Sequence, residues 1–240
     1  LPEPSIFLKS GSVPVSSRCL VAEPIQGEGG FIVPAEGFLP GLLSWCKDNG
    51  IVYISDEVQS GMARTGKYFA SEHFGIEPDL VTSAKGIGGG MPIAAVTGRA
   101  EIMDSSHPGG LGGTFGGNPV SSAAVVAVFE EVKNRNLLAE AIRIESTLKP
   151  ALEKLQKKHS QVGDVRGIGA MLAMELVDPK TGDPDASLAK EIQNFAMRSG
   201  VLVLTAGTYA NVVRFLPALV ITDEQLLASV AVLDEALKSL

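Results

Sequence analysis

The chain has 240 residues, 45% of them hydrophobic, and a formal net charge of −7 at pH 7, which gives enough apolar material for one domain or two small ones. Its 20 basic residues are outnumbered by 27 acidic ones and are scattered, so the electrostatic pattern of a nucleic-acid-binding protein is missing. No apolar run approaches the ~18 residues of a membrane span, and the first residues lack the layout of a signal peptide. We therefore expect a cytoplasmic protein with no nucleic-acid or membrane partner.

Metal binding is not indicated. Cys19 and Cys46 do not have metal-ligand spacing with each other or with the three histidines. We expect both cysteines to be reduced packing residues.

The predicted elements begin after residues 1–17, which are rich in Pro, Ser and Gly and are expected to form a loop or surface excursion. Hydrophobic patterning then predicts strands at 19–22, 51–55, 80–83 and 93–97. Helices are predicted at 36–49, ending at Gly50, and at 118–133 and 137–159, with a loop at 60–67.

The pattern changes from Val162 to short strands and helices. Strands are predicted at 162–166, 170–176, 201–204 and 212–216, and helices at 186–199 and from Asp223 onward. Thr222 and Gln225 form a candidate capping box for the last helix. We expect a division into residues 1–136 and an α+β unit at 137–240.

Two opposite charges follow successive apolar strands. Asp56 comes after Ile51–Ser55, and Lys85 comes after Asp79–Ala84. In an open α/β sheet the C-terminal strand ends face the ligand crevice, so we expect both charges to be buried at one site. A buried lysine beside a carboxylate is costly unless chemistry uses it. Alone, each has an ordinary interpretation, a surface lysine and a strand-end cap; together they suit an aldehyde cofactor with a basic ring nitrogen.

The residues around this pair resemble the class III aminotransferases. The matching segments are 56–61, 64–67, 83–90, 23–30, 113–119 and Arg214-Phe215, so the resemblance covers nearly everything after residue 18. Within the family, the segments 109–114 and 211–217 are most similar to 4-aminobutyrate aminotransferases, and the acetylornithine and ornithine enzymes are the nearest rivals. The resemblance implies an α/β fold of fold-type I: a large-domain portion with a mostly parallel sheet and flanking helices at 1–136, then a small α+β C-terminal domain at 137–240.

The family resemblance also implies pyridoxal 5'-phosphate as cofactor. It assigns to Lys85 the Schiff base and the proton transfer, and to Asp56 the pairing with the ring nitrogen. Val58 would pack on a ring face and Gln59 would reach the ring hydroxyl. Thr114 would bind the cofactor phosphate of a partner subunit, which implies a homodimer or higher homo-oligomer with the active site at the subunit interface.

Substrate binding is assigned by the same resemblance. Arg214 would hold the α-carboxylate of glutamate or 2-oxoglutarate, because arginine grips a carboxylate with two parallel hydrogen bonds. Glu28 would pair with Arg214 when a substrate has no α-carboxylate. Glu23 is a further active-site carboxylate, although Glu-Pro at a strand end is also a turn. The expected reaction transfers the amino group of 4-aminobutyrate, or a similar ω-amino acid, to 2-oxoglutarate.

Other interpretations stay open. Relatives carry a long upstream region that this sequence lacks, so we expect a C-terminal portion that binds cofactor poorly alone. It is then either part of a transaminase or an inert chain that acts as an interaction subunit. An aminomutase or racemase would share Lys85 and Asp56. A nucleotide hydrolase is disfavoured, because Tyr68 stands where a phosphate-binding loop needs a small hydroxyl residue for magnesium.

Overall fold

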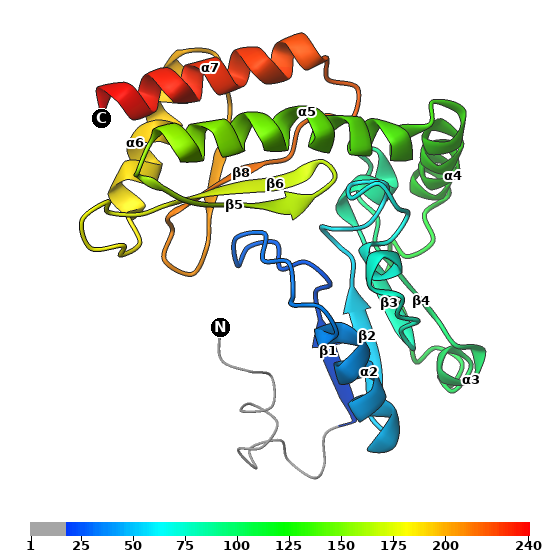
Figure 1. Cartoon of the computed structure of the whole chain (residues 1–240). Coiled ribbons are helices and arrows are strands. Elements are labelled where there is room, and N and C mark those ends of the chain that lie inside the picture. Colours follow the sequence, from blue (N-terminus) through cyan, green and yellow to red (C-terminus); the bar gives the residue numbers. More distant parts are fainter. Residues whose placement is uncertain (1–17) are drawn as a thin grey trace.

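The computed structural model describes residues 18–240, so the loop predicted for residues 1–17 lies outside the described range. Two four-stranded sheets organise the chain, each accompanied by helices (Figure 1). The first half contains β1 (Cys19–Ala22), α2 (Phe38–Asp48), β2 (Val52–Asp56), η1 (Ala70–Phe74), β3 (Leu80–Ser83), η2 (Lys85–Gly88), β4 (Ala95–Gly98), α3 (Ala100–Met103) and α4 (Pro119–Asn134). The second contains α5 (Leu137–Lys158), β5 (Val162–Ile168), β6 (Met171–Leu176), α6 (Ala186–Arg198), β7 (Leu204–Ala206), β8 (Val212–Phe215) and α7 (Asp223–Ser239).

The first sheet has the order β1-β2-β3-β4. β1, β2 and β3 are parallel, and β4 pairs antiparallel with β3. Helix α2 buries Leu39, Leu43 and Cys46 against Tyr53 of β2. The C-terminal ends of β2 and β3 lie side by side, with Asp56 opposite Thr82. The predicted α/β unit with a mostly parallel sheet is therefore confirmed.

The second sheet is antiparallel throughout, in the order β5-β6-β8-β7. Alternate residues of its strands point to opposite faces. On one face Leu172, Met174 and Val213 pack against α5, α6 and α7. On the other face Met171, Ala173 and Val212 pack against Ile25 and Phe31, which belong to the loop after β1. This second contact brings the 23–32 loop onto the sheet.

The turn between β5 and β6 also packs against the loop that follows β2. The N–H of Ala170 donates to the carbonyl of Arg64 at 2.9 Å, and Arg64 Nη1 donates to the carbonyl of Pro217 at 2.6 Å. Gly169 has φ +62°, and a Cβ placed there would lie 2.5 Å from the carbonyl carbon of Thr65. Only glycine allows both this backbone conformation and this close approach.

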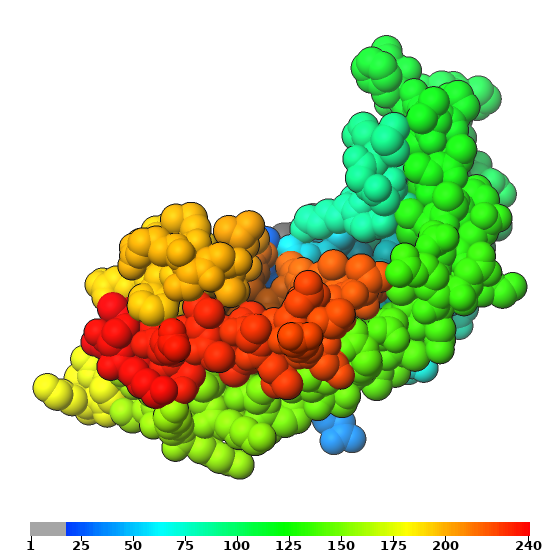
Figure 2. Space-filling model, turned by 90° about the horizontal axis from the view of Figure 1, so that it is seen from above, coloured from blue at the N-terminus to red at the C-terminus, as the bar shows by residue number. Residues whose placement is uncertain are grey.

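The molecule is angular. Figure 2 shows α4 and its neighbouring segments as an arm that rises from the mass formed by the C-terminal helices. Large apolar side chains are exposed on α4 and the loop before it: Leu111, Phe115, Val120, Val126 and Phe129. Within residues 18–240, no helix is both long and apolar enough to cross a membrane.

Most predicted elements are confirmed to within two residues, and so is the capping box of Thr222 and Gln225. The helix predicted from residue 36 begins at Phe38, because Gly37 takes a left-handed conformation, with φ 78°. The strand predicted at 201–204 is wrong, since β7 covers Leu204–Ala206, where β8 offers hydrogen-bonding partners. η1, η2 and α3 had no counterpart in the prediction. The division at residue 137 stays a prediction.

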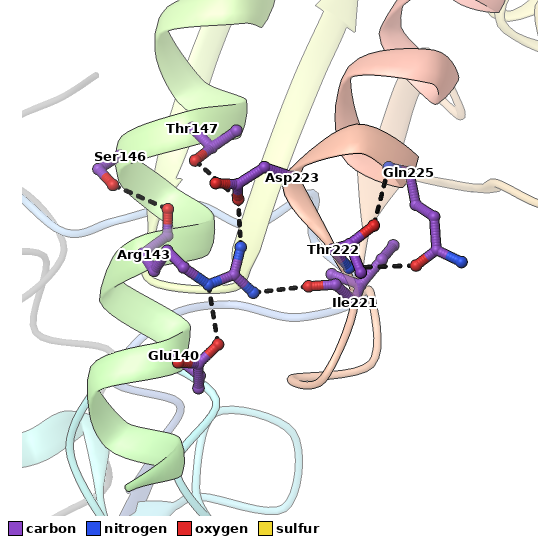
Figure 3. Close-up of polar contacts among 8 residues, drawn as sticks. All are labelled: Glu140, Arg143, Ser146, Thr147, Ile221, Thr222, Asp223 and Gln225. Carbon is purple, nitrogen blue, oxygen red and sulfur yellow. Dashed lines mark hydrogen bonds and ion pairs between the residues drawn. The ribbon is translucent and has the colours of Figure 1, made fainter.

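The start of helix α7 is hydrogen-bonded to α5 through Arg143 (Figure 3). Arg143 Nε donates to Glu140 at 2.8 Å, Nη1 donates to Asp223, and Nη2 donates to the carbonyl of Ile221 at 2.6 Å. The Thr147 hydroxyl also donates to Asp223, at 3.1 Å. The start of α7 is thus hydrogen-bonded to the side of α5.

Replacing Arg143 by methionine should lower the free energy of unfolding by about 1–2 kcal/mol, because a carbonyl and two carboxylates lose a shared charged donor. Urea denaturation measures this. The matched control is Arg135→Gln, which removes an exposed pair with Glu131 at 3.7 Å and should cost less than about 0.5 kcal/mol. Equal losses in both variants would contradict the role given to Arg143.

Candidate functional site

Asp56 is the last residue of β2, and the neighbouring strand orients its carboxylate. Its Oδ1 accepts hydrogen bonds from the N–H of Val58 at 3.0 Å and from the hydroxyl of Thr82 at 3.1 Å. No donor in residues 18–240 is hydrogen-bonded to its Oδ2. Asp56 is half-buried. The strand end therefore presents one fixed carboxylate oxygen that is still able to accept a hydrogen bond.

Lys85 opens η2, directly beyond the end of β3, and has a left-handed backbone with φ 47°. It is exposed, and it forms no ion pair with Asp56 in the described part of the chain. The expectation that both charges are buried is thus wrong for Lys85, because no residue among 18–240 covers its side chain. The two side chains still come from adjacent ends of parallel strands. This donor set, an amine and an oriented carboxylate, fits the expected aldehyde cofactor with a basic ring nitrogen.

Glu28, Gln59 and Arg214 are brought together from three distant parts of the sequence. Arg214 Nη1 donates to Glu28 Oε1 at 2.6 Å and to Gln59 Oε1 at 3.4 Å, and Gln59 Nε2 donates to Glu28 Oε1 at 3.0 Å. The side chain of Arg214 is 13% exposed, whereas that of Glu28 is 71% exposed. Arg214 Nε is buried without a partner among the described residues. The guanidinium therefore has unused hydrogen-bonding capacity beneath a solvent-exposed carboxylate.

The charges of this cluster are coupled. The hydrogen bond from Arg214, and then that from Gln59, lowers the pKa of Glu28 below its ordinary value. The positive charge of Lys85 acts in the same direction and is the smallest of these causes. Arg214, Glu28 and Gln59 thus form one hydrogen-bonded unit.

Three further predicted site residues lie in different surroundings, and Val58, half-buried, follows Asp56 directly after Glu57. Glu23 is half-buried and accepts a hydrogen bond from the N–H of Gly27 at 2.7 Å, so one of its oxygens organises the loop that carries Glu28. Thr114 is exposed in a turn before α4. None of its contacts connects it with the other candidate residues in the described part of the chain.

Three residues near the site had no role in the sequence prediction. Glu57 is buried and accepts hydrogen bonds from the Ser60 hydroxyl and from two N–H groups at the start of η1. Phe31 is fully buried, and its ring lies 6.0 Å from Arg214 Cζ. Arg166 donates to the carbonyl of Gly30 at 2.9 Å. The sequence around Arg166 does not indicate that it bonds to the backbone of Gly30, which is distant in the chain.

Comparison with known proteins gives consistent matches. A sequence profile of the family described as aminotransferase class-III matches residues 17–237. A 4-aminobutyrate aminotransferase from Mycobacterium leprae is 52% identical over 218 residues, which are 91% of this chain and 49% of that relative. The chain thus spans about half the length of the curated relatives it matches.

Solved structures agree with the fold. A phospholyase from Arthrobacter, in complex with phosphoethanolamine, has a TM-score of 0.88 and 32% identity, covering 92% of this chain and 53% of that one. An acetylornithine aminotransferase from Elizabethkingia anophelis has a TM-score of 0.83 and 38% identity, covering 92% of this chain and 54% of that one.

The pKa of Glu28 gives a test of the cluster. Because the folded-state pKa is lowered, the pair with Arg214 is complete above the ordinary value of 4.5 and is lost as the pH falls through the lower folded-state value. A carbon-13 NMR titration of the Glu28 carboxyl should find a midpoint below 4.5. In Arg214→Gln the midpoint should move upward. If Glu28 titrates with the same midpoint in the unsubstituted protein and in Arg214→Gln, Arg214 does not lower the pKa of Glu28 and the proposed pair is contradicted.

Proposed function

The chain belongs to the class-III aminotransferase family, whose members depend on pyridoxal phosphate, and on this premise we propose that the protein transfers the amino group of 4-aminobutyrate to 2-oxoglutarate. The products are succinate semialdehyde and glutamate. Its α/β fold is that of fold-type I transaminases. The 52% identity to a 4-aminobutyrate aminotransferase supports this donor over others.

In this proposal the strand ends hold the cofactor. Pyridoxal phosphate, when bound, supplies an electron sink for the charge left on the substrate carbon after proton removal. The Lys85 amine would hold the cofactor and move that proton, and the Asp56 carboxylate would pair with the ring nitrogen. Val58 would pack against the ring, Gln59 would hydrogen-bond near the ring hydroxyl, and Thr114 would bind a cofactor phosphate. The fixed Asp56 carboxylate and its position beside the end of β3 support these roles.

The observation that carries the proposal is the unequal exposure of Arg214 and Glu28. A guanidinium that is only 13% exposed needs an anion beside it at all times, and Glu28, at 71%, is free to leave. 4-Aminobutyrate has its only carboxylate far from the reacting amine, so Glu28 stays on Arg214 when it binds. The α-carboxylate of 2-oxoglutarate takes the place of Glu28. One site thus serves two substrates in turn, as a ping-pong reaction requires.

Two other functions remain as alternatives. An acetylornithine- or ornithine-type aminotransferase is favoured by the structural likeness to the Elizabethkingia anophelis protein. The neighbouring phospholyase shows that this fold also hosts reactions other than transamination. A chain that is inert and serves only as an interaction subunit would keep the fold and never react with the cofactor.

A homodimer is part of the proposal. The apolar side chains exposed on α4 and the preceding loop support an interface there, because exposed large apolar side chains are common at association sites. Thr114 lies in the same loop. A second copy covering this arm would bring Thr114 to the partner's cofactor.

Covalent trapping tests the role of Lys85. Borohydride treatment of the full-length protein with pyridoxal phosphate should leave the cofactor on the peptide that contains Lys85, and Lys85→Ala should carry none. The fold should survive, because alanine and lysine share the β-carbon that makes the left-handed conformation at this position unfavourable. Lys67→Ala removes another exposed lysine and should label normally. If Lys85→Ala is labelled as strongly as the unsubstituted protein, the role of Lys85 is refuted. If neither the unsubstituted protein nor the variants are labelled, the inert alternative is favoured.

Substrate kinetics test Arg214. Arg214→Gln should raise KM for 2-oxoglutarate about 10- to 100-fold, the loss expected for a charged hydrogen bond to a carboxylate, and KM for 4-aminobutyrate much less. Arg135→Gln, far from the site, should change neither. Faster turnover with N-acetylornithine than with 4-aminobutyrate in the unsubstituted protein would instead support the acetylornithine alternative.

A further inference from the structure

A second arginine stands in the same cross-strand row as Arg214. Arg166 of β5 lies opposite Ala173 of β6, and Ala173 lies opposite Arg214 of β8. Directly opposed residues of an antiparallel sheet point to the same face. Both arginines therefore project from the face that packs against Phe31, with the small side chain of Ala173 between them.

The loop that carries Glu28 is bonded to both arginines. Arg166 Nε donates to the carbonyl of Gly30 at 2.9 Å, and Arg214 Nη1 donates to the carboxylate of Glu28 at 2.6 Å. Gly30 lies flat on the sheet: a Cβ there would be 3.1 Å from Val212 and 3.2 Å from Arg166 Nη2. In Figure 1 this loop follows β1 and lies against β5 and β6. Arg166 thus holds the backbone two residues away from the Glu28 side chain.

The two arginines differ in how their charges are balanced. Arg166 Nη1 donates to Asp164 at 2.8 Å and to Glu175 at 2.6 Å, so two carboxylates balance its charge. Its side chain is only 14% exposed. Arg214 has a single, exposed carboxylate partner. Each guanidinium has one buried nitrogen without a partner in residues 18–240, Nη2 in Arg166 and Nε in Arg214. The charge of Arg166 already faces two carboxylates, so a substrate carboxylate has more to gain by displacing Glu28 from Arg214.

We propose that Arg166 is a positioning residue that fixes the backbone of the 26–32 loop, so that Glu28 leaves and regains Arg214 by side-chain motion alone. This rests on the proposed two-substrate use of Arg214. The loop is also held by the buried Phe31 ring and by the N–H of Gly207, which donates to the Glu28 carbonyl at 3.0 Å. Without the bond to Gly30, the backbone between these two attachments gains freedom when Glu28 is released, and Glu28 returns to Arg214 less often. The ω-amino donor needs Glu28 on Arg214, so its binding is the binding that weakens.

The test uses the full-length protein with its cofactor and the variants Arg166→Met and Arg166→Lys. Arg166→Met should raise KM for 4-aminobutyrate about tenfold, equivalent to about 1.4 kcal/mol. KM for 2-oxoglutarate should stay constant or fall, because Arg214 is then free more often. Arg166→Lys keeps a positive charge beside Asp164 and Glu175, but an ammonium group does not reach Gly30 as well. It should therefore raise KM for 4-aminobutyrate and not for 2-oxoglutarate, by a smaller factor than Arg166→Met.

Arg143→Met is the matched control, since Arg143 also bonds two carboxylates and one carbonyl, but at α7 and away from the loop. A merely structural role for Arg166 predicts that both variants lower kcat and leave the ratio of the two KM values unchanged. Hydrogen–deuterium exchange gives a readout apart from activity. Peptides covering 26–32 should exchange faster in Arg166→Met and not in Arg143→Met.

The outcomes separate this inference from the proposed function. If Arg214→Gln fails to weaken 2-oxoglutarate binding, the two-substrate proposal itself is wrong. If Arg214→Gln behaves as expected but both Arg166 variants change the two KM values equally, or leave exchange of 26–32 unchanged, only the role of Arg166 is overturned. A donor-specific rise in KM together with faster exchange of the loop establishes it.

Discussion

An arginine that has lost most of its contact with water must keep an anion beside it, because an uncompensated buried charge costs several kcal/mol. Arg214 is in this position, and its only carboxylate partner in the described residues is Glu28. The carboxylate comes from a loop distant in sequence, so the fold must bring that loop to β8 and hold it there. Much of the packing around the site serves this one electrostatic requirement.

The loop meets the requirement by combining a buried anchor with an exposed tip. Phe31 is fully buried against Met171, Ala173 and Val212, which fixes the loop through apolar contact. Its φ of 56° is unfavourable for a residue with a β-carbon, and burial of the aromatic ring offsets that cost. Glu28, three residues earlier, remains 71% exposed. The backbone is thus held firmly while the charged side chain keeps its freedom.

The sequence pattern was sufficient for the parts of the fold that depend on local periodicity. The parallel strands, the long helices α4 and α5, and the capping box at Thr222 follow from apolar spacing and side-chain chemistry. The run Val201–Leu204 has the composition of a strand, yet β7 forms later, because strand formation needs the hydrogen-bonding partners that β8 supplies. Local composition alone does not reveal where such a partner lies.

Only part of the site could be predicted from the sequence, for a related reason. Motif resemblance paired Glu28 with Arg214, and the structure contains that contact. Gln59, expected at the ring hydroxyl, is hydrogen-bonded to both of them, which was not predicted. It gave no role to Arg166, because the row that joins Arg166, Ala173 and Arg214 exists only through the register of three strands. Nor did it foresee that Lys85 is exposed, which depends on what covers the end of β3.

The fold alone does not select the reaction, since a phospholyase and an acetylornithine aminotransferase are both close structural neighbours. In the proposed function Lys85 and Asp56 serve the cofactor, and an aminomutase or racemase would use the same two residues. Transamination between two unlike substrates differs from these reactions because, as proposed, Arg214 keeps Glu28 with one substrate and exchanges it for the carboxylate of the other. Arg166 contacts two carboxylates, whereas Arg214 contacts a single, exposed one. The difference between two arginines in one row of a sheet therefore carries more functional information than the sheet itself.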